Sequence, residues 1–76
     1  MSVLHEILSS GKGWAVERAT IALQIEEGLQ QGAISPAEAK ELLEDLVRAD
    51  KLEAEADDLE VKTMLVTGIY AIIQVC

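Results

Sequence analysis

The fold is decided by the stretch Gly32-Ala33-Ile34-Ser35-Pro36-Ala37-Glu38, which carries a stop signal for one helix and a start signal for the next. Ser35 is placed to cap a helix, because its side-chain oxygen can accept a hydrogen bond from a backbone N–H of the first turn. Pro36 fits the first helical position, where a missing N–H costs nothing, and Glu38 completes a capping box with Ser35. Gly32 is typical of the residue that follows a helix end. The stretch therefore predicts a turn and a helix that begins at Pro36.

Helical patterns precede this turn. Apolar residues recur at helical spacing from Trp14 to Gln31, so the segment Trp14–Arg48 is expected to form an αα-hairpin. Further upstream, Ser2 can cap a short helix that stops at Gly11. The apolar face of this short helix consists of Val3, Leu4, Ile7 and Leu8.

Downstream of the turn, apolar residues continue at spacings of three and four. A first series comprises Ala39, Leu42, Leu46 and Ala49, and a heptad-like second series comprises Leu52, Ala56, Leu59, Thr63, Val66, Tyr70 and Ile73. A spacing of three joins the two series where four is expected, which indicates either local overwinding of one long helix or a break near residues 48–50. We favour the break, because Asp50-Lys51-Leu52-Glu53 resembles a second capping box. A strand over residues 61–76 is the alternative to a helix there, since Val, Ile and Thr are frequent.

Composition sets the type of core. The chain has 76 residues, of which 50% are hydrophobic and only 3% aromatic. A core must therefore be built from Leu, Ile, Val and Ala in a single domain over residues 1–76. We predict an all-α fold, a small helical bundle built on the αα-hairpin, with about three main helices plus a short N-terminal helix, completed by oligomerisation.

The charge balance limits the classes of partner that the chain is expected to bind. The formal net charge is −8 at pH 7, from 14 acidic and 6 basic side chains. Binding to nucleic acid through phosphate neutralisation, or to a membrane through a polybasic patch, is disfavoured. The longest uncharged stretch, residues 63–76, is too short to span a bilayer. With no targeting signal recognisable in residues 1–10, we expect a soluble, cytoplasmic protein that binds neither nucleic acid nor membrane.

Residues that could carry chemistry are few. His5 is the only histidine and has no recognisable triad partner, and Cys76 is the only cysteine. The Gly-Lys pair within residues 9–13 lacks the spacing of a phosphate-binding loop. We therefore expect no enzyme activity, no cofactor and no metal site.

The acidic run over residues 53–60 has three interpretations. Residues 38–60 hold ten acids and three bases, which is a net charge of −7. We favour a solvated helical face, partly neutralised by the pairs Asp58–Lys62 and Glu44–Arg48. The alternatives are mimicry of nucleic-acid phosphates by helix-borne carboxylates and a divalent-metal site, for which no EF-hand spacing is present.

Two residues of the Trp14–Gln31 segment interrupt its pattern. Arg18 falls within the apolar face, either as a buried or interfacial guanidinium that pairs with a carboxylate, or with its stem packed and its head in solvent. Gly28 weakens the helix interior and is interpreted as a point of close helix packing.

The C-terminal segment suggests how the protein acts. Apolar residues of 61–76 surround nearly the whole helix, so one face is expected to pack on the hairpin and the other to remain uncovered. We expect Leu59, Val66, Tyr70 and Ile73 to face the hairpin, and Val61, Leu65, Gly68 and Ile72 to face outward. The predicted interface residues are Arg18, Val61, Leu65, Ile69, Ile72 and Val75.

These expectations favour a non-enzymatic, small acidic adaptor or accessory protein that works by helix-mediated self-association or partner binding, with a homodimer as the simplest assembly. The alternative function is an acidic inhibitor, of phage or mobile-element type, that occupies a basic site of a nucleic-acid-binding enzyme by charge mimicry.

Overall fold

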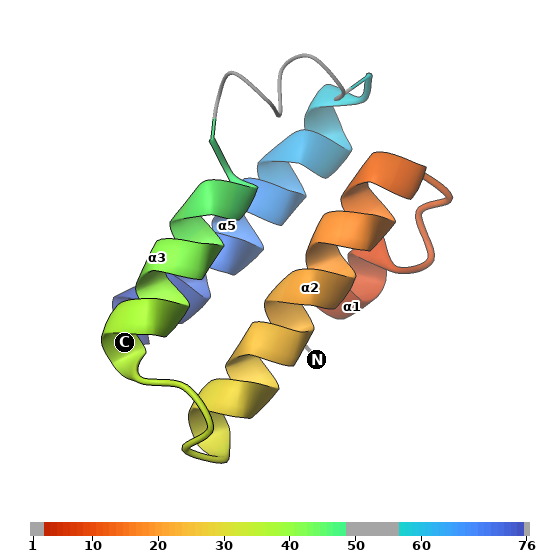
Figure 1. Cartoon of the computed structure of the whole chain (residues 1–76). Coiled ribbons are helices and arrows are strands. Elements are labelled where there is room, and N and C mark those ends of the chain that lie inside the picture. Colours follow the sequence, from red (N-terminus) through yellow and green to blue (C-terminus); the bar gives the residue numbers. More distant parts are fainter. Residues whose placement is uncertain (1–2, 49–56, 76) are drawn as a thin grey trace.

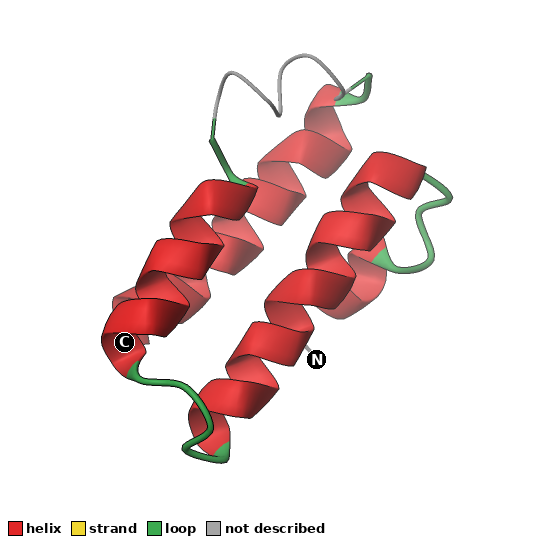
Figure 2. Cartoon of the chain, in the orientation of Figure 1, coloured by secondary structure: helices red, strands yellow, loops and turns green. Residues whose placement is uncertain are grey.

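The computed structural model describes residues 3–48 and 57–75, and within them the chain is all-α (Figures 1 and 2). The helices are α1 (Val3–Ile7), α2 (Gly13–Gln30), α3 (Pro36–Leu46) and α5 (Leu59–Val75). The prediction of a small helical bundle, with three longer helices and a short N-terminal one, is confirmed.

The three longer helices form the body of the bundle. Each of α2, α3 and α5 packs against the other two, and α1 packs on α2 and α5 (Figure 1). The short α1 thus covers a part of α5 that the hairpin of α2 and α3 leaves open.

The turn between α2 and α3 has the chemistry that its sequence indicates. The Ser35 hydroxyl oxygen accepts a hydrogen bond from the backbone N–H of Glu38 at 3.2 Å and lies 3.3 Å from the Glu38 carboxylate, to which the hydroxyl donates. Helix α3 begins at Pro36, as predicted. The Ser35 cap is confirmed, but the second bond of the predicted capping box is not formed, because the Glu38 carboxylate accepts from the Ser35 hydroxyl and not from its backbone N–H.

The end of α2 is a Schellman motif. Gly32 has a φ of +75°, the left-handed conformation that favours glycine. The backbone N–H of Gly32 donates to the carbonyl of Leu29 at 3.2 Å, and that of Ala33 donates to the carbonyl of Gly28 at 2.8 Å. These bonds satisfy carbonyls at the helix end, and they confirm the αα-hairpin.

The region after α3 contains a break, as favoured above. Helix α3 ends at Leu46, and the next described helix, α5, begins at Leu59. Asp58 caps α5, because its carboxylate accepts a hydrogen bond from the backbone N–H of Val61 at 3.2 Å. Residues 36–75 are therefore not one helix, and residues 61–75 are helical rather than a strand. The capping box expected at residues 50–53 lies outside the described residues.

The core is aliphatic and draws on all four helices. Its buried hydrophobic side chains are Leu4, Ile7, Ala15, Ala19, Ala22, Ile25, Ala39, Leu43, Leu65, Ile69 and Ile72. Four alanines in this set allow the helices to approach closely.

The predicted orientation of α5 is wrong. Leu65, Gly68 and Ile72, expected to face outward, are buried in the core of the chain. Leu59 and Tyr70, expected to pack on the hairpin, are exposed. The physical reason is α1, because Leu4 packs so closely on Gly68 that a Cβ at position 68 would lie 3.0 Å from the Leu4 side chain.

Candidate interaction surface

One side of α5 carries a partly exposed, mostly apolar row, which we call the α5 outer face. Its residues follow one another at spacings of four and three, and they are Leu59, Thr63, Val66, Tyr70 and Ile73. Leu59 is 77% exposed and Tyr70 46% exposed, while Val66 and Ile73 are half-buried against the core. Because residues three and four apart share one side of a helix, these side chains form a continuous stripe. The stripe has the spacing of a coiled-coil seam.

The α5 outer face is also electrically neutral. Glu60 and Lys62 are the charged residues of α5, and both lie in its first turn. Residues 63–75 carry no charge in a chain whose net charge is −8. Two copies of this chain can therefore approach each other here with less repulsion than over their acidic surfaces.

The structure separates the residues predicted to form an interface. Leu65, Ile69 and Ile72 belong to the buried core, whereas Val61 is half-buried and Val75 is exposed. The first three are thus used in folding the single chain and present no surface. The heptad-like spacing in the sequence identifies the exposed row. The sequence analysis expects this row to face the hairpin, whereas in the structure its large side chains Leu59 and Tyr70 are exposed.

Arg18 is half-buried rather than buried. Its guanidinium Nη1 donates to the backbone carbonyl of Trp14, one turn earlier in α2, at 3.2 Å. Among the described residues, no charged or polar side chain is fully buried. A pairing of Arg18 with a carboxylate of another chain stays a prediction.

A small polar cluster connects the start of α2 to the start of α5. The indole Nε1 of Trp14 donates to the Asp57 carboxylate at 3.0 Å, and the Lys12 ammonium lies 3.6 Å from the same oxygen. The hydrogen bond from Trp14 is the main cause that lowers the pKa of Asp57 from its ordinary 3.8, and the charge of Lys12 lowers it further. The cluster is exposed and serves to hold the two helix starts together.

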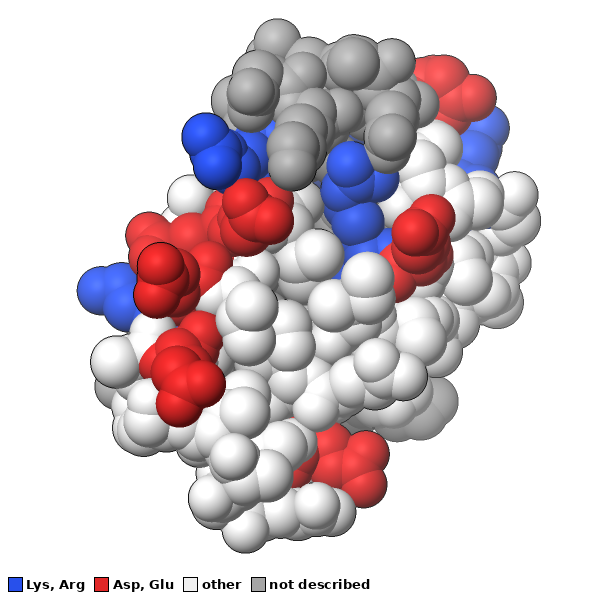
Figure 3. Space-filling model, in the orientation of Figure 1, with Lys and Arg blue, Asp and Glu red and all other residues white. Residues whose placement is uncertain are grey.

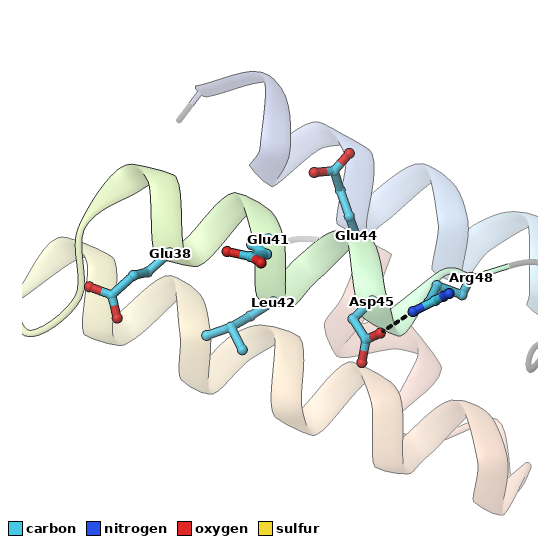
Figure 4. Close-up of a pocket in the computed structure, with 6 residues that line it drawn as sticks. All are labelled: Glu38, Glu41, Leu42, Glu44, Asp45 and Arg48. Atoms are coloured by element: carbon cyan, nitrogen blue, oxygen red, sulfur yellow. Dashed lines mark hydrogen bonds and ion pairs between the residues drawn. The ribbon is translucent and has the colours of Figure 1, made fainter.

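Acidic side chains gather over α3 on the molecular face shown in Figure 3. An open hollow of about 640 Å³ follows α3 and is lined by Glu38, Glu41, Leu42, Glu44, Asp45 and Arg48. Figure 4 shows Leu42 and Asp45 on the side of α3 next to α2, and Glu44 on the other side. The carboxylates therefore diverge instead of converging on one point.

Arg48 pairs with Asp45 at 3.4 Å, where the sequence predicted a pair with Glu44. The difference arises because α3 ends at Leu46, so that Arg48 no longer has the helical geometry of the i,i+4 pair. Across residues 3–48 and 57–75, no group of three or more His, Cys, Asp or Glu side chains is arranged to hold a metal ion.

Gly28 does not mark a close helix approach. A Cβ at this position would lie 3.5 Å from the Ile34 side chain, which is an ordinary contact. The prediction of close packing at Gly28 is wrong, and Gly68 is the glycine at which two helices meet closely.

None of the helices in the described part of the chain has the length and hydropathy needed to cross a membrane. His5 lies exposed on α1, and Cys76 is outside the described residues. When the chain is compared with protein-family models, with curated proteins and with solved structures, nothing matches it.

Proposed function

We propose that this chain is a non-enzymatic, acidic accessory protein that acts through helix-mediated self-association, and that the α5 outer face is the contact surface. The observation that carries the proposal is the exposure of Leu59 and Tyr70 in a row with coiled-coil spacing. Burying aliphatic and aromatic surface of this kind is favourable by roughly 25 cal/mol per Å² removed from water.

A second copy of the chain fits this face better than an acidic or basic partner. The row is neutral, so it offers no opposite charge to a strongly charged surface, and a two-fold axis would pair it with the same row of a second copy. In such a dimer, the side chains of the row on one α5 would pack between the side chains of the same row on the other α5, as knobs into holes.

The size of the face sets the strength of association. Helix α5 has 17 residues, and such a helix is about 25 Å long. A contact along one helix is smaller than the roughly 1,600 Å² of a standard interface. We therefore expect a dimer that forms at micromolar concentration and dissociates on dilution.

Paired polar variants test the proposal. The double variant Leu59→Gln with Tyr70→Gln replaces the two large exposed side chains of the row by polar ones. It leaves the net charge unchanged and replaces no buried residue. The matched control is Leu8→Gln with Leu42→Gln, which replaces two exposed leucines outside α5. Gel filtration coupled to light scattering should report a dimer for the parent and for the control. It should report a folded monomer of about 8.2 kDa for the double variant of α5.

The proposal would be refuted if the double variant of α5 were still a dimer, or if the parent were a monomer at hundreds of micromolar. Ile72→Asp does not serve as a test, because Ile72 lies in the core and a buried aspartate is expected to unfold the chain itself.

Charge mimicry is the second candidate function. The acidic surface along α3, with Glu38, Glu41, Glu44 and Asp45, favours it. Salt separates the two modes, since a complex held by carboxylates weakens steeply as screening shortens to a few ångströms at ~0.5 M salt. Association through the α5 outer face should persist under those conditions.

A further inference from the structure

An apolar groove lies on the side of α5 opposite to the α5 outer face. Its volume is about 390 Å³, and its walls come from Val3 and Leu4 of α1, from Glu26 of α2, and from Gly68, Ala71 and Val75 of α5. Val75 is 79% exposed, so the groove opens to solvent near the end of α5. This volume is at the lower end of the range for small-molecule sites, about 300–1,000 Å³.

Glu26 is the charged residue in this lining. It is half-buried, and in the described part of the chain its carboxylate has neither a hydrogen bond nor an ion pair. Its oxygens are not enclosed, so water solvates the carboxylate, and the ammonium group of a ligand can replace that water. The groove thus combines mainly aliphatic walls with one carboxylate, from Glu26, and one hydroxyl, from Thr67.

Its size argues for a small ligand rather than a protein. A specific protein interface needs about 800 Å² from each partner, far more than one groove formed by a few side chains can offer. A short aliphatic chain, by contrast, is small enough to lie in the groove beside α1 and α5.

We propose that this groove binds a small amphipathic cation, namely an aliphatic chain that ends in a protonated amine. The chain lies against Val3, Ala71 and Val75, and the ammonium donates to the carboxylate of Glu26. The inference is independent of self-association, because the α5 outer face uses other residues of the same helix.

Hexylammonium is a suitable probe, and 1-hexanol is its neutral counterpart with the same chain. Titration of the parent with each, followed by ¹⁵N–¹H NMR, should shift the amide signals of Gly68 and Ala71. We expect hexylammonium to bind about fivefold more tightly than 1-hexanol, the ratio that about 1 kcal/mol from a partly exposed ion pair provides.

Glu26→Gln should abolish this preference and leave the binding of 1-hexanol unchanged. The matched control is Glu27→Gln, which changes the net charge equally at an exposed side chain that is bonded to Gln31 at 3.2 Å. The control should retain the preference, which distinguishes a local ion pair from attraction by the whole acidic chain.

Equal affinities of the parent for both probes, or shifts confined to α3, would overturn the proposal. If Glu26→Gln failed to fold, Ala71→Leu would serve instead, because Ala71 is exposed and a larger side chain would fill the groove. Ala71→Leu should weaken the binding of both probes, and unchanged affinities would contradict the proposed site.

Discussion

The indole N–H of Trp14 is hydrogen-bonded to the carboxylate of Asp57 at 3.0 Å, across a sequence separation of 43 residues. Trp14 lies in the first turn of α2, and Asp57 lies two residues before α5 begins. The bond therefore fixes the entry of the chain into α5 relative to the hairpin. Since Trp14 is the only tryptophan, its fluorescence reports on this contact directly.

Asp57 should make stability depend on acid pH. Its pKa is lowered in the folded chain, chiefly by the hydrogen bond from Trp14, so the unfolded chain binds the proton more tightly. The stabilising contribution is then complete above the ordinary pKa of 3.8 and is lost as the pH falls through the lower folded value. Thermal melts of the parent and of Asp57→Asn should converge as the pH falls below about 4. A constant difference in melting temperature across this range would contradict the assignment.

Gly68 should resist substitution, in contrast to Gly28. A Cβ at Gly68 would lie 3.0 Å from Cγ and Cδ2 of Leu4, a side chain that is almost fully buried and would have to shift. We expect Gly68→Ala to lower the free energy of unfolding by about 1–2 kcal/mol, because overpacking exceeds the gain in helix propensity. Urea denaturation provides the measurement.

Gly28→Ala is the matched control for Gly68→Ala, since its Cβ would make an ordinary contact with Ile34 at 3.5 Å. Alanine should stabilise α2 here by up to about 1 kcal/mol. If both alanine variants were equally stable, the close approach of α1 to α5 would be wrong.

Ser35→Ala should cost about 1 kcal/mol of stability, because the backbone N–H of Glu38 would lose its acceptor at 3.2 Å. Ser35→Asn, which retains a capping oxygen and an N–H donor for the Glu38 carboxylate, should be close to the parent in chemical denaturation. Equal losses in both variants would show that the loss of stability does not come from the missing capping oxygen.

Gly32 should tolerate no β-branched residue. Its φ of +75° disfavours any side chain with a Cβ, so Gly32→Val should destabilise the chain more than Ser35→Ala does. The two variants can be compared by urea denaturation, from the midpoint and the slope of each unfolding curve. A Val variant as stable as the parent would mean that the Schellman motif is not formed.

The local signals of the sequence were sufficient for the hairpin. Ser35, Pro36 and Gly32 act through bonds within a few residues of themselves, so their roles can be inferred without knowledge of the rest of the fold. The break after α3 was predicted from the spacing of apolar residues, but the cap of α5, Asp58, was not among the signals used.

The orientation of α5 could not be predicted in this way. Both the stripe with Leu65 and Ile72 and the stripe with Leu59 and Tyr70 are apolar, so periodicity alone does not tell which of them faces the core. The choice depends on α1, whose Leu4 fits over Gly68 and completes the cover of the first stripe. A five-residue helix contributes little to a sequence pattern, yet here it decides which side of α5 is buried and which is left exposed.

The central claim is that two copies of the chain meet through the α5 outer face. Isotope-filtered NOE spectroscopy on a mixture of labelled and unlabelled chains tests it most directly. The account predicts intermolecular contacts between the Tyr70 ring and the methyl groups of Leu59, Val66 and Ile73, the exposed and half-buried members of that face. Intermolecular contacts that map to Leu8 or Leu42 instead, or none at concentrations well above the dissociation constant expected here, would contradict it.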